Sequence, residues 1–112
     1  MNDHDPDGRV PLKWCPPAVG TALIRYRATS ALAYCTHLYD IHGDMTIVTD
    51  RDPRTLSSGE RVLWAILLDL ANGIRRPVDD YDTHRLDVEN MRATATVFTE
   101  AGAAWSNTWA SS

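Results

Sequence analysis

The chain has 112 residues, of which 44% are hydrophobic and 23% are charged, and its formal net charge at pH 7 is −4. This length suits one domain with a single core, and the composition is typical of a globular protein and argues against wholesale disorder. The net negative charge disfavours nucleic acid as a partner, and the longest apolar run, Val62–Leu68, falls far short of the about 20 residues that a membrane span needs.

Residues 1–17 are predicted to form an acidic, extended N-terminal arm. Asp3, Asp5 and Asp7 have the spacing that opens an EF-hand calcium loop, but Trp14 stands where such a loop needs its bidentate Glu. A solvated terminus is therefore the expectation, with cation binding as the alternative. The arm is acidic where a secretory signal would be basic and then apolar, so we expect a cytoplasmic protein with reduced thiols.

Residues 18–42 are predicted to form a long helix, with a break allowed near Thr29 and Ser30 because both are poor helix formers. Just before it, residues 9–17 alternate weakly between polar and apolar positions, which indicates a short extended segment. Tyr34 and Tyr39 place large amphipathic rings on the expected helix, and such rings suit a half-buried helix or a docking surface equally.

Asp44–Asp50 is the best strand candidate, because its β-branched residues are bounded by Gly43 and by a turn-like segment. A lone strand leaves its backbone groups unpaired. Its partner is either the segment 10–14 or the same strand of a second subunit, and in the second case Thr46–Thr49 is the expected seam.

Thr55–Gly73 is predicted to be an amphipathic helix with both ends marked. Ser57 and Glu60 have the spacing of a capping box, and Gly73 offers the left-handed residue that closes a helix. Between them, apolar residues recur at helical spacing and form one stripe. The members of the stripe are Val62, Leu63, Ile66, Leu67 and Leu70.

A further helix is predicted over Thr83–Gly102, with Asp80 or Asp82 as its N-cap. Its apolar seam is expected to consist of Val88, Met91, Ala95 and Phe98. The remaining residues, 103–112, form an uncharged tail in which Trp105 and Trp109 are four apart, so a helix would place them on one face. Either a Trp closes the core, or the pair is an exposed hook for a partner.

These elements predict a mainly α fold: a small three-helix domain over residues 18–102, with one short strand or a two-stranded edge. No catalytic or cofactor motif stands out. A zinc site would have to combine residues that lack paired ligand spacing, and Cys35 and His42 would share a helix face but supply only two ligands. The zinc candidates are Cys15, Cys35, His37, His42 and His84.

Two further clusters of charged residues allow a functional interpretation as well as a structural one. Asp79, Asp80 and Asp82 would suit a cation or acid–base chemistry, although a run of like charges in a loop is ordinarily solvated. Arginines before and within the last helix would serve nucleic-acid binding, with a helix-turn-helix made from the last two helices as one arrangement, but acidic residues surround them. These arginines are Arg75, Arg76, Arg85 and Arg92.

The segment LSSGERVLWAILLDLANG, followed by a charged loop and a helix that opens LDVENMRATATVF, resembles small helical proteins of actinobacterial phages and prophages. The almost complete use of Arg in place of Lys agrees with such a source. The resemblance covers the second half of the chain and implies no particular activity and no site residues. It favours proteins that act by binding, because small phage proteins often redirect host machinery or assist particle assembly.

We therefore expect a small non-enzymatic cytoplasmic protein that acts through protein–protein contacts, without cofactor or metal. Its partner is another protein, such as a component of host machinery, or a second copy of itself. The expected partner-binding residues are Trp105, Trp109, Tyr34 and Tyr39. The alternatives are a structural or assembly component of a phage particle, which would be virion-associated, and a DNA-binding regulator.

Overall fold

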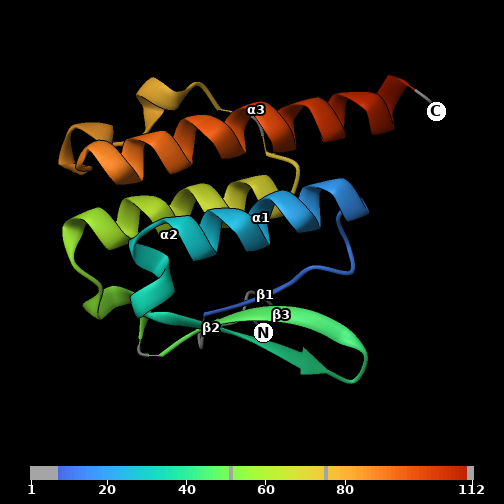
Figure 1. The fold of residues 1–112 in the computed structure, drawn as a ribbon, viewed down its shortest axis with the longest axis horizontal. Coiled ribbons are helices and arrows are strands. Elements are labelled where there is room, and N and C mark those ends of the chain that lie inside the picture. Colours follow the sequence, from blue (N-terminus) through green and yellow to red (C-terminus); the bar gives the residue numbers. More distant parts are fainter. Residues whose placement is uncertain (1–7, 51, 75, 111–112) are drawn as a thin grey trace.

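A three-stranded antiparallel sheet lies against one side of a pair of helices, and a third helix crosses their other side (Figure 1). The structure is a computed structural model that describes residues 8–50, 52–74 and 76–110, with side chains through Ser106. Over this part of the chain, the helices and strands are β1 (Arg9–Pro11), α1 (Pro17–Thr29), β2 (Thr36–Ile41), β3 (Asp44–Thr49), α2 (Ser58–Ala71) and α3 (Val88–Ala110).

The described residues are mainly helical and contain three α-helices, as the sequence predicts. The sheet is larger than expected, because it has three strands where one strand or a two-stranded edge was predicted. The described helices are also too short or too polar for any of them to cross a lipid bilayer.

Helix α2 confirms the predictions at both of its ends. The Ser57 hydroxyl accepts a hydrogen bond from the Glu60 N–H at 3.2 Å, and the Glu60 carboxylate accepts one from the Ser57 N–H at 3.0 Å. These two bonds satisfy donors that the first turn cannot satisfy itself. Gly73 follows the helix with φ +74°, the left-handed conformation that ends helices. The predicted apolar stripe is buried, so α2 anchors the core.

The prediction of one helix over residues 18–42 is wrong beyond the break that it allowed. Helix α1 ends at Thr29, and Ser30 is extended, with its hydroxyl accepting from the Leu32 N–H. A short 3₁₀ helix, η1 (Ala31–Tyr34), leads into strand β2. Burial alternates from Thr36 to Tyr39, and β3 supplies hydrogen-bonding partners that outweigh the local helix signal.

Strand β3 confirms the predicted strand and is the central strand of the sheet, between β1 and β2. It pairs with Val10 and its neighbours, one of the two partners that the sequence allowed. Thr46–Thr49 is therefore not a seam for a second subunit, because both of its sides are already paired within the chain. His42 and Gly43, with φ +54° and +83°, form the tight turn between β2 and β3.

Helix α3 begins later and buries a different face than expected. Residues 83–85 form a separate 3₁₀ helix, and the Asp87 carboxylate, rather than Asp80 or Asp82, accepts from the N–H of Asn90 at 2.9 Å. The helix then continues through the expected tail to Ala110. Its buried residues are Ala93, Thr94, Val97 and Ala101. Of the predicted seam, Val88, Met91 and Ala95 are exposed, and Phe98 is partly buried against the core.

Small side chains explain this choice of face. The largest buried group opposite them is Tyr26 of α1, whose hydroxyl lies 3.1 Å from the Thr94 hydroxyl. A face of Ala and Thr lets α3 approach α1 closely around this ring, which a seam of Met and Phe would not allow.

Candidate functional site

The aromatic residues predicted to bind a partner lie on opposite layers of the fold. Tyr34 is 85% exposed in η1, and Tyr39 is 51% exposed on β2, with its ring centroid 6.0 Å from that of His37. Trp105 belongs to α3, on the far side of the helix pair from the sheet (Figure 1). The structure therefore does not join Trp105 and the tyrosines into one surface. The side chain of Trp109 lies outside the described residues.

Trp105 makes the contacts of a residue that closes the core. Its indole N–H donates to the carbonyl of Leu70 at 2.7 Å, and its ring lies so close to Gly73 that a Cβ there would be 3.4 Å away. The ring is partly buried against the hydrophobic core. This arrangement corresponds to the alternative in which a tail Trp completes the core.

The cysteines and histidines do not assemble as the zinc alternative requires. Cys35 and His42 lie at the two ends of strand β2 and not on one helix face, so that prediction is wrong. Cys15 and Cys35 are buried free thiols, and burial raises the pKa of the Cys15 thiol. Among the described residues, no group of three or more His, Cys, Asp and Glu side chains could hold a metal ion.

The charged residues of the remaining alternatives are partly paired with one another. The Arg76 Nε lies 3.1 Å from the carboxylate of Asp69, and the Arg85 Nε lies 3.7 Å from that of Asp82. Residues 72–87 form a long connection with two 3₁₀ turns, unlike the short turn of a helix-turn-helix. The N-terminal aspartates Asp3, Asp5 and Asp7, and Arg75 of the nucleic-acid alternative, lie outside the described residues.

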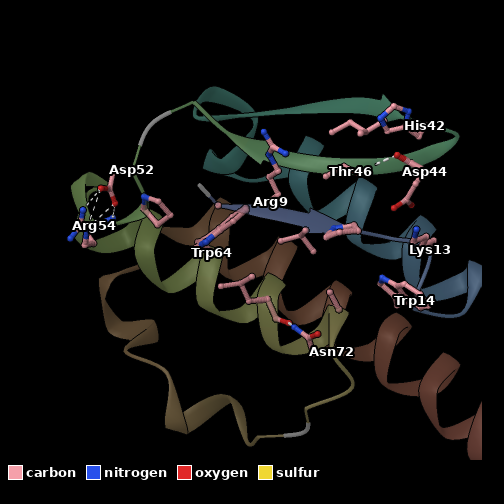
Figure 2. Close-up of a pocket in the computed structure, with 17 residues that line it drawn as sticks. Arg9, Lys13, Trp14, His42, Asp44, Thr46, Asp52, Arg54, Trp64 and Asn72 are labelled. Carbon is pink, nitrogen blue, oxygen red and sulfur yellow. Dashed lines mark hydrogen bonds and ion pairs between the residues drawn. The ribbon is translucent and has the colours of Figure 1, made fainter. Parts of the chain in front are cut away.

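A groove of about 1030 Å³, which the sequence did not predict, lies between strand β1 and helix α2. Figure 2 shows its two ends: Asp52 and Arg54 stand at one, and Lys13 and Trp14 stand at the other. We call it the β1 groove. Its volume falls at the upper end of the range for ligand pockets in proteins.

The floor of the β1 groove is apolar. Its lining includes Trp64 and Leu68 of α2 and Val10 of β1. Trp64 is 5% exposed, so its ring supports the groove without projecting into solvent. Trp64 and Leu68 lie beside the apolar stripe of α2, and Leu68 is only partly buried.

The rim of the β1 groove carries one unusually exposed aromatic side chain. Trp14 is 76% exposed, and the Lys13 ammonium lies 5.0 Å from the centroid of its ring, a cation–π contact. Cys15 and the proline pair after it return the chain to the core at the start of α1, so the Lys13–Trp14 pair stands on a short, constrained turn. An indole held in this way is a preformed contact surface.

At the other end of the groove, the guanidinium of Arg54 forms an ion pair with the carboxylate of Asp52. The guanidinium donates from Nη2 to Oδ2 at 2.6 Å, and from Nε to both Oδ1 and Oδ2 at 3.1 Å. The Arg54 side chain and the Arg54 N–H, which also donates to this carboxylate, lower the pKa of Asp52 to about 2. Asp52 is consequently ionised at neutral pH and is a very weak base.

Two signals in the sequence could have drawn attention to the groove. A Lys-Trp pair directly before a cysteine and two prolines is an exposed aromatic on a stiff turn, and Trp64 interrupts the apolar stripe of α2. Neither signal identifies the other as its neighbour, because β1 and α2 are brought together only by the fold. Compared with family models, with curated proteins and with solved structures, the chain has no match, so the site is argued from its geometry.

Proposed function

We propose that this protein is a non-catalytic binding module whose β1 groove holds an extended segment of a partner protein. The observation that carries the proposal is Trp14, which is 76% exposed at the rim of a groove with an apolar floor. Exposing an indole to water is unfavourable, and Trp is enriched among the residues that dominate protein–protein binding. In this proposal the groove replaces the partner-binding residues that the sequence suggested, which are Tyr34, Tyr39, Trp105 and Trp109.

The chemistry of the groove favours binding over catalysis. Asp52 is held ionised by Arg54, so it is poorly suited to take up a proton. The Cys15 thiol is buried, donates to the Leu12 carbonyl at 3.1 Å, and has a raised pKa, so it is a weak nucleophile. These groups stabilise the local structure.

The expected partner segment is apolar and acidic. Lys13 is exposed on the groove wall, and its ammonium lies over the Trp14 ring, at the opposite end of the groove from Asp52 and Arg54. An acidic residue of a partner would gain from the Lys13 charge. Pro11 has no N–H to offer on this edge of the sheet, so the segment is bound by side chains and not by addition of a full strand.

The resemblance of the second half of the chain to actinobacterial phage and prophage proteins makes a host protein the expected partner. Two free, buried thiols are compatible with the reducing cytoplasm as the place of action. Among the described residues, the groove is a more specific feature than any that favours a DNA-binding regulator. In particular, Arg76 and Arg85 each lie beside a carboxylate.

The proposal is tested with a displayed library of random peptides, selected on the intact protein. We expect enriched peptides that combine an apolar residue with Asp or Glu, and that shift the backbone amide resonances of β1 and α2. Trp14→Ala should weaken their binding at least about tenfold, as for an interface anchor. Tyr34→Ala is the matched control, since Tyr34 is similarly exposed but lies outside the groove.

Three results would contradict the proposal. These are a library that yields no enriched peptide, a Trp14→Ala variant that binds as well as the native chain, and resonance shifts that fall on α3. A fluorescent DNA duplex is tested beside the peptides, to distinguish a peptide-binding module from a DNA-binding regulator. Duplex binding that weakens steeply with salt would indicate phosphate contacts and favour the regulator.

A further inference from the structure

Strand β2 forms the other edge of the sheet, on the opposite side of β3 from the groove strand β1. In an antiparallel pair, the backbone groups of successive residues point alternately toward the partner strand and away from it. The Asp50 N–H donates to the Cys35 carbonyl at 2.8 Å, so the odd-numbered residues of β2 bond to β3. The backbone groups that face outward belong to Thr36, Leu38 and Asp40.

The two edges of the sheet differ in their protection. On β1, Pro11 lacks an N–H, and exposed charges are carried by Arg9 on the strand and by Lys13 just after it. Both features disfavour pairing with a further strand. Strand β2 contains no proline, and its outward-facing positions include one charged residue, Asp40. An edge of this kind is a template for a further strand.

We propose that β2 pairs antiparallel with β2 of a second copy of this chain, around a two-fold axis at Leu38. In this register the outward residues match one another: Leu38 faces the partner's Leu38, and Thr36 faces the partner's Asp40. Every outward backbone group of the strand then meets a donor or an acceptor. A two-fold arrangement uses the same patch twice, as most homodimers do.

Charge complementarity supports this register. The Arg27 guanidinium lies at the edge of the sheet, where its Nε donates to the Thr36 hydroxyl at 3.0 Å and its Nη2 to the Thr36 carbonyl at 2.9 Å. Side chains of directly opposed residues point to the same face of a sheet. The partner's Asp40 therefore comes beside Arg27, and the symmetry repeats this ion pair. The Thr36 carbonyl has a second lone pair for the new backbone bond.

On the outer face of the sheet, the aromatic side chains of the two copies also match one another in the proposed dimer. His37 and Tyr39 already form a ring pair within one chain, with centroids 6.0 Å apart. In the proposed register, each His37 faces the partner's Tyr39, so the two pairs merge into one aromatic cluster. Tyr34, which is 85% exposed just before the strand, extends toward the partner's turn at His42.

The interface is expected to be small. Stable dimers bury about 1,600 Å² in total, and two six-residue strands alone bury less, so the aromatic side chains supply the remainder. Self-association in the micromolar range is therefore expected. The resulting sheet has β2 at its centre and the two β1 grooves at its outer ends, so a partner with two copies of the bound segment would gain from both. This inference does not depend on the proposed function.

Sedimentation velocity of the intact chain, over a range of protein concentrations, tests the dimer. Asp40→Arg places Arg beside the partner's Arg27, and Arg27→Asp places Asp beside the partner's Asp40, so each variant alone should associate at least about tenfold more weakly. An equimolar mixture of the two variants restores both ion pairs and should restore the dimer. Asp79→Arg, on the exposed 3₁₀ turn after α2, is the control for charge reversal.

Asp40 also accepts from the N–H of Gly43 at 2.8 Å, within the β2–β3 turn. Asp40→Asn keeps an oxygen acceptor for this bond and removes the charge, so it should weaken association while leaving the thermal midpoint of the monomer unchanged. A native chain that stays monomeric at several hundred micromolar would overturn the proposal. A dimer that is insensitive to both charge reversals would do the same.

Amide hydrogen exchange gives a second measurement that needs no variant. The N–H groups of Leu38 and Asp40 should exchange more slowly as the protein concentration rises through the dimer range. The N–H groups of His37 and Tyr39, which already bond to β3, serve as internal controls and should be unaffected. Equal exchange of the Leu38 amide at low and high concentration would overturn the proposal, even if a dimer forms elsewhere.

Discussion

The indole N–H of Trp105 and the carbonyl of Leu70 form a 2.7 Å hydrogen bond that joins helix α3 to the C-terminal end of α2. The Leu70 carbonyl also accepts from the Gly73 N–H at 3.3 Å, so the indole adds a second, shorter hydrogen bond to a carbonyl at the end of the helix. The Trp105 ring covers Gly73 beside it. A residue that the sequence offers as a docking hook thus stabilises the junction of two helices.

Trp105→Ala should destabilise the protein by about 2–3 kcal/mol. The variant loses the burial of the ring against the core and the hydrogen bond to Leu70. Urea unfolding followed by circular dichroism measures the change. Trp14→Ala is the control, because Trp14 is exposed and its loss should move the unfolding free energy by less than about 0.5 kcal/mol. Equal midpoints for the two variants would show that Trp105 does not close the core.

Gly73→Ala should cost about 1–2 kcal/mol, for two reasons that act together. At φ +74° an L-residue is strained, and the added Cβ would lie 3.4 Å from the Trp105 ring. Gly102→Ala is the matched control, because a Cβ there meets no described atom within 4 Å. That substitution lies inside α3 and should be neutral or stabilising. Thermal unfolding of both variants, scanned at the same rate, distinguishes these expectations.

Local signals predicted helix α2 and strand β3 correctly. Ser57 and Glu60 cap α2, and Gly73 ends it. Each of these features depends only on residues that are close together in the sequence. The β-branched run before Asp50 is likewise strand-forming in isolation. Such elements can be predicted because the residues that determine them are adjacent in the chain.

Strand β2 and the buried face of α3 could not be predicted in this way. Leu38 and Tyr39 fit a helical spacing as well as a strand, and only the hydrogen bonds to β3 decide between them. The face of α3 is chosen by the Tyr26 ring, which demands small residues opposite it. The β1 groove was missed for the same reason, since Trp14 and Trp64 become neighbours only in the folded chain.

Ser57→Ala should destabilise the protein by about 1 kcal/mol, since the variant leaves the Glu60 N–H without its capping oxygen. Ser58→Ala is the control: Ser58 is the first residue of α2 and is exposed, so a gain in helix propensity is the main effect expected there. Chemical unfolding of the two variants in parallel measures the difference. If Ser58→Ala were the more damaging of the two, the capping box would not be what starts this helix.

Stability should fall as the pH rises above about 10, because burial raises the pKa of the Tyr26 hydroxyl. An unfolded tyrosine loses its proton near pH 10, whereas the folded protein retains the proton on Tyr26, so the folded state binds more protons in this range. The contribution of Tyr26 to the free energy of unfolding is therefore complete below pH 10 and decreases as the pH rises above this value. The Thr94 hydroxyl opposes this shift, and the nearby Tyr81 adds to it.

Urea unfolding at several pH values between 8 and 11.5 tests this prediction, with the pH range chosen about the reference value for Tyr. Tyr26→Phe should cost about 1 kcal/mol at pH 8, because Thr94 loses its partner, but should lose less stability than the native chain on going to high pH. Some alkaline loss should remain, since burial also raises the pKa of Tyr81, whose hydroxyl donates to Asp69 at 2.6 Å. Tyr34→Phe, at an exposed position, should follow the native profile, and an unchanged slope in Tyr26→Phe would remove Tyr26 as its cause.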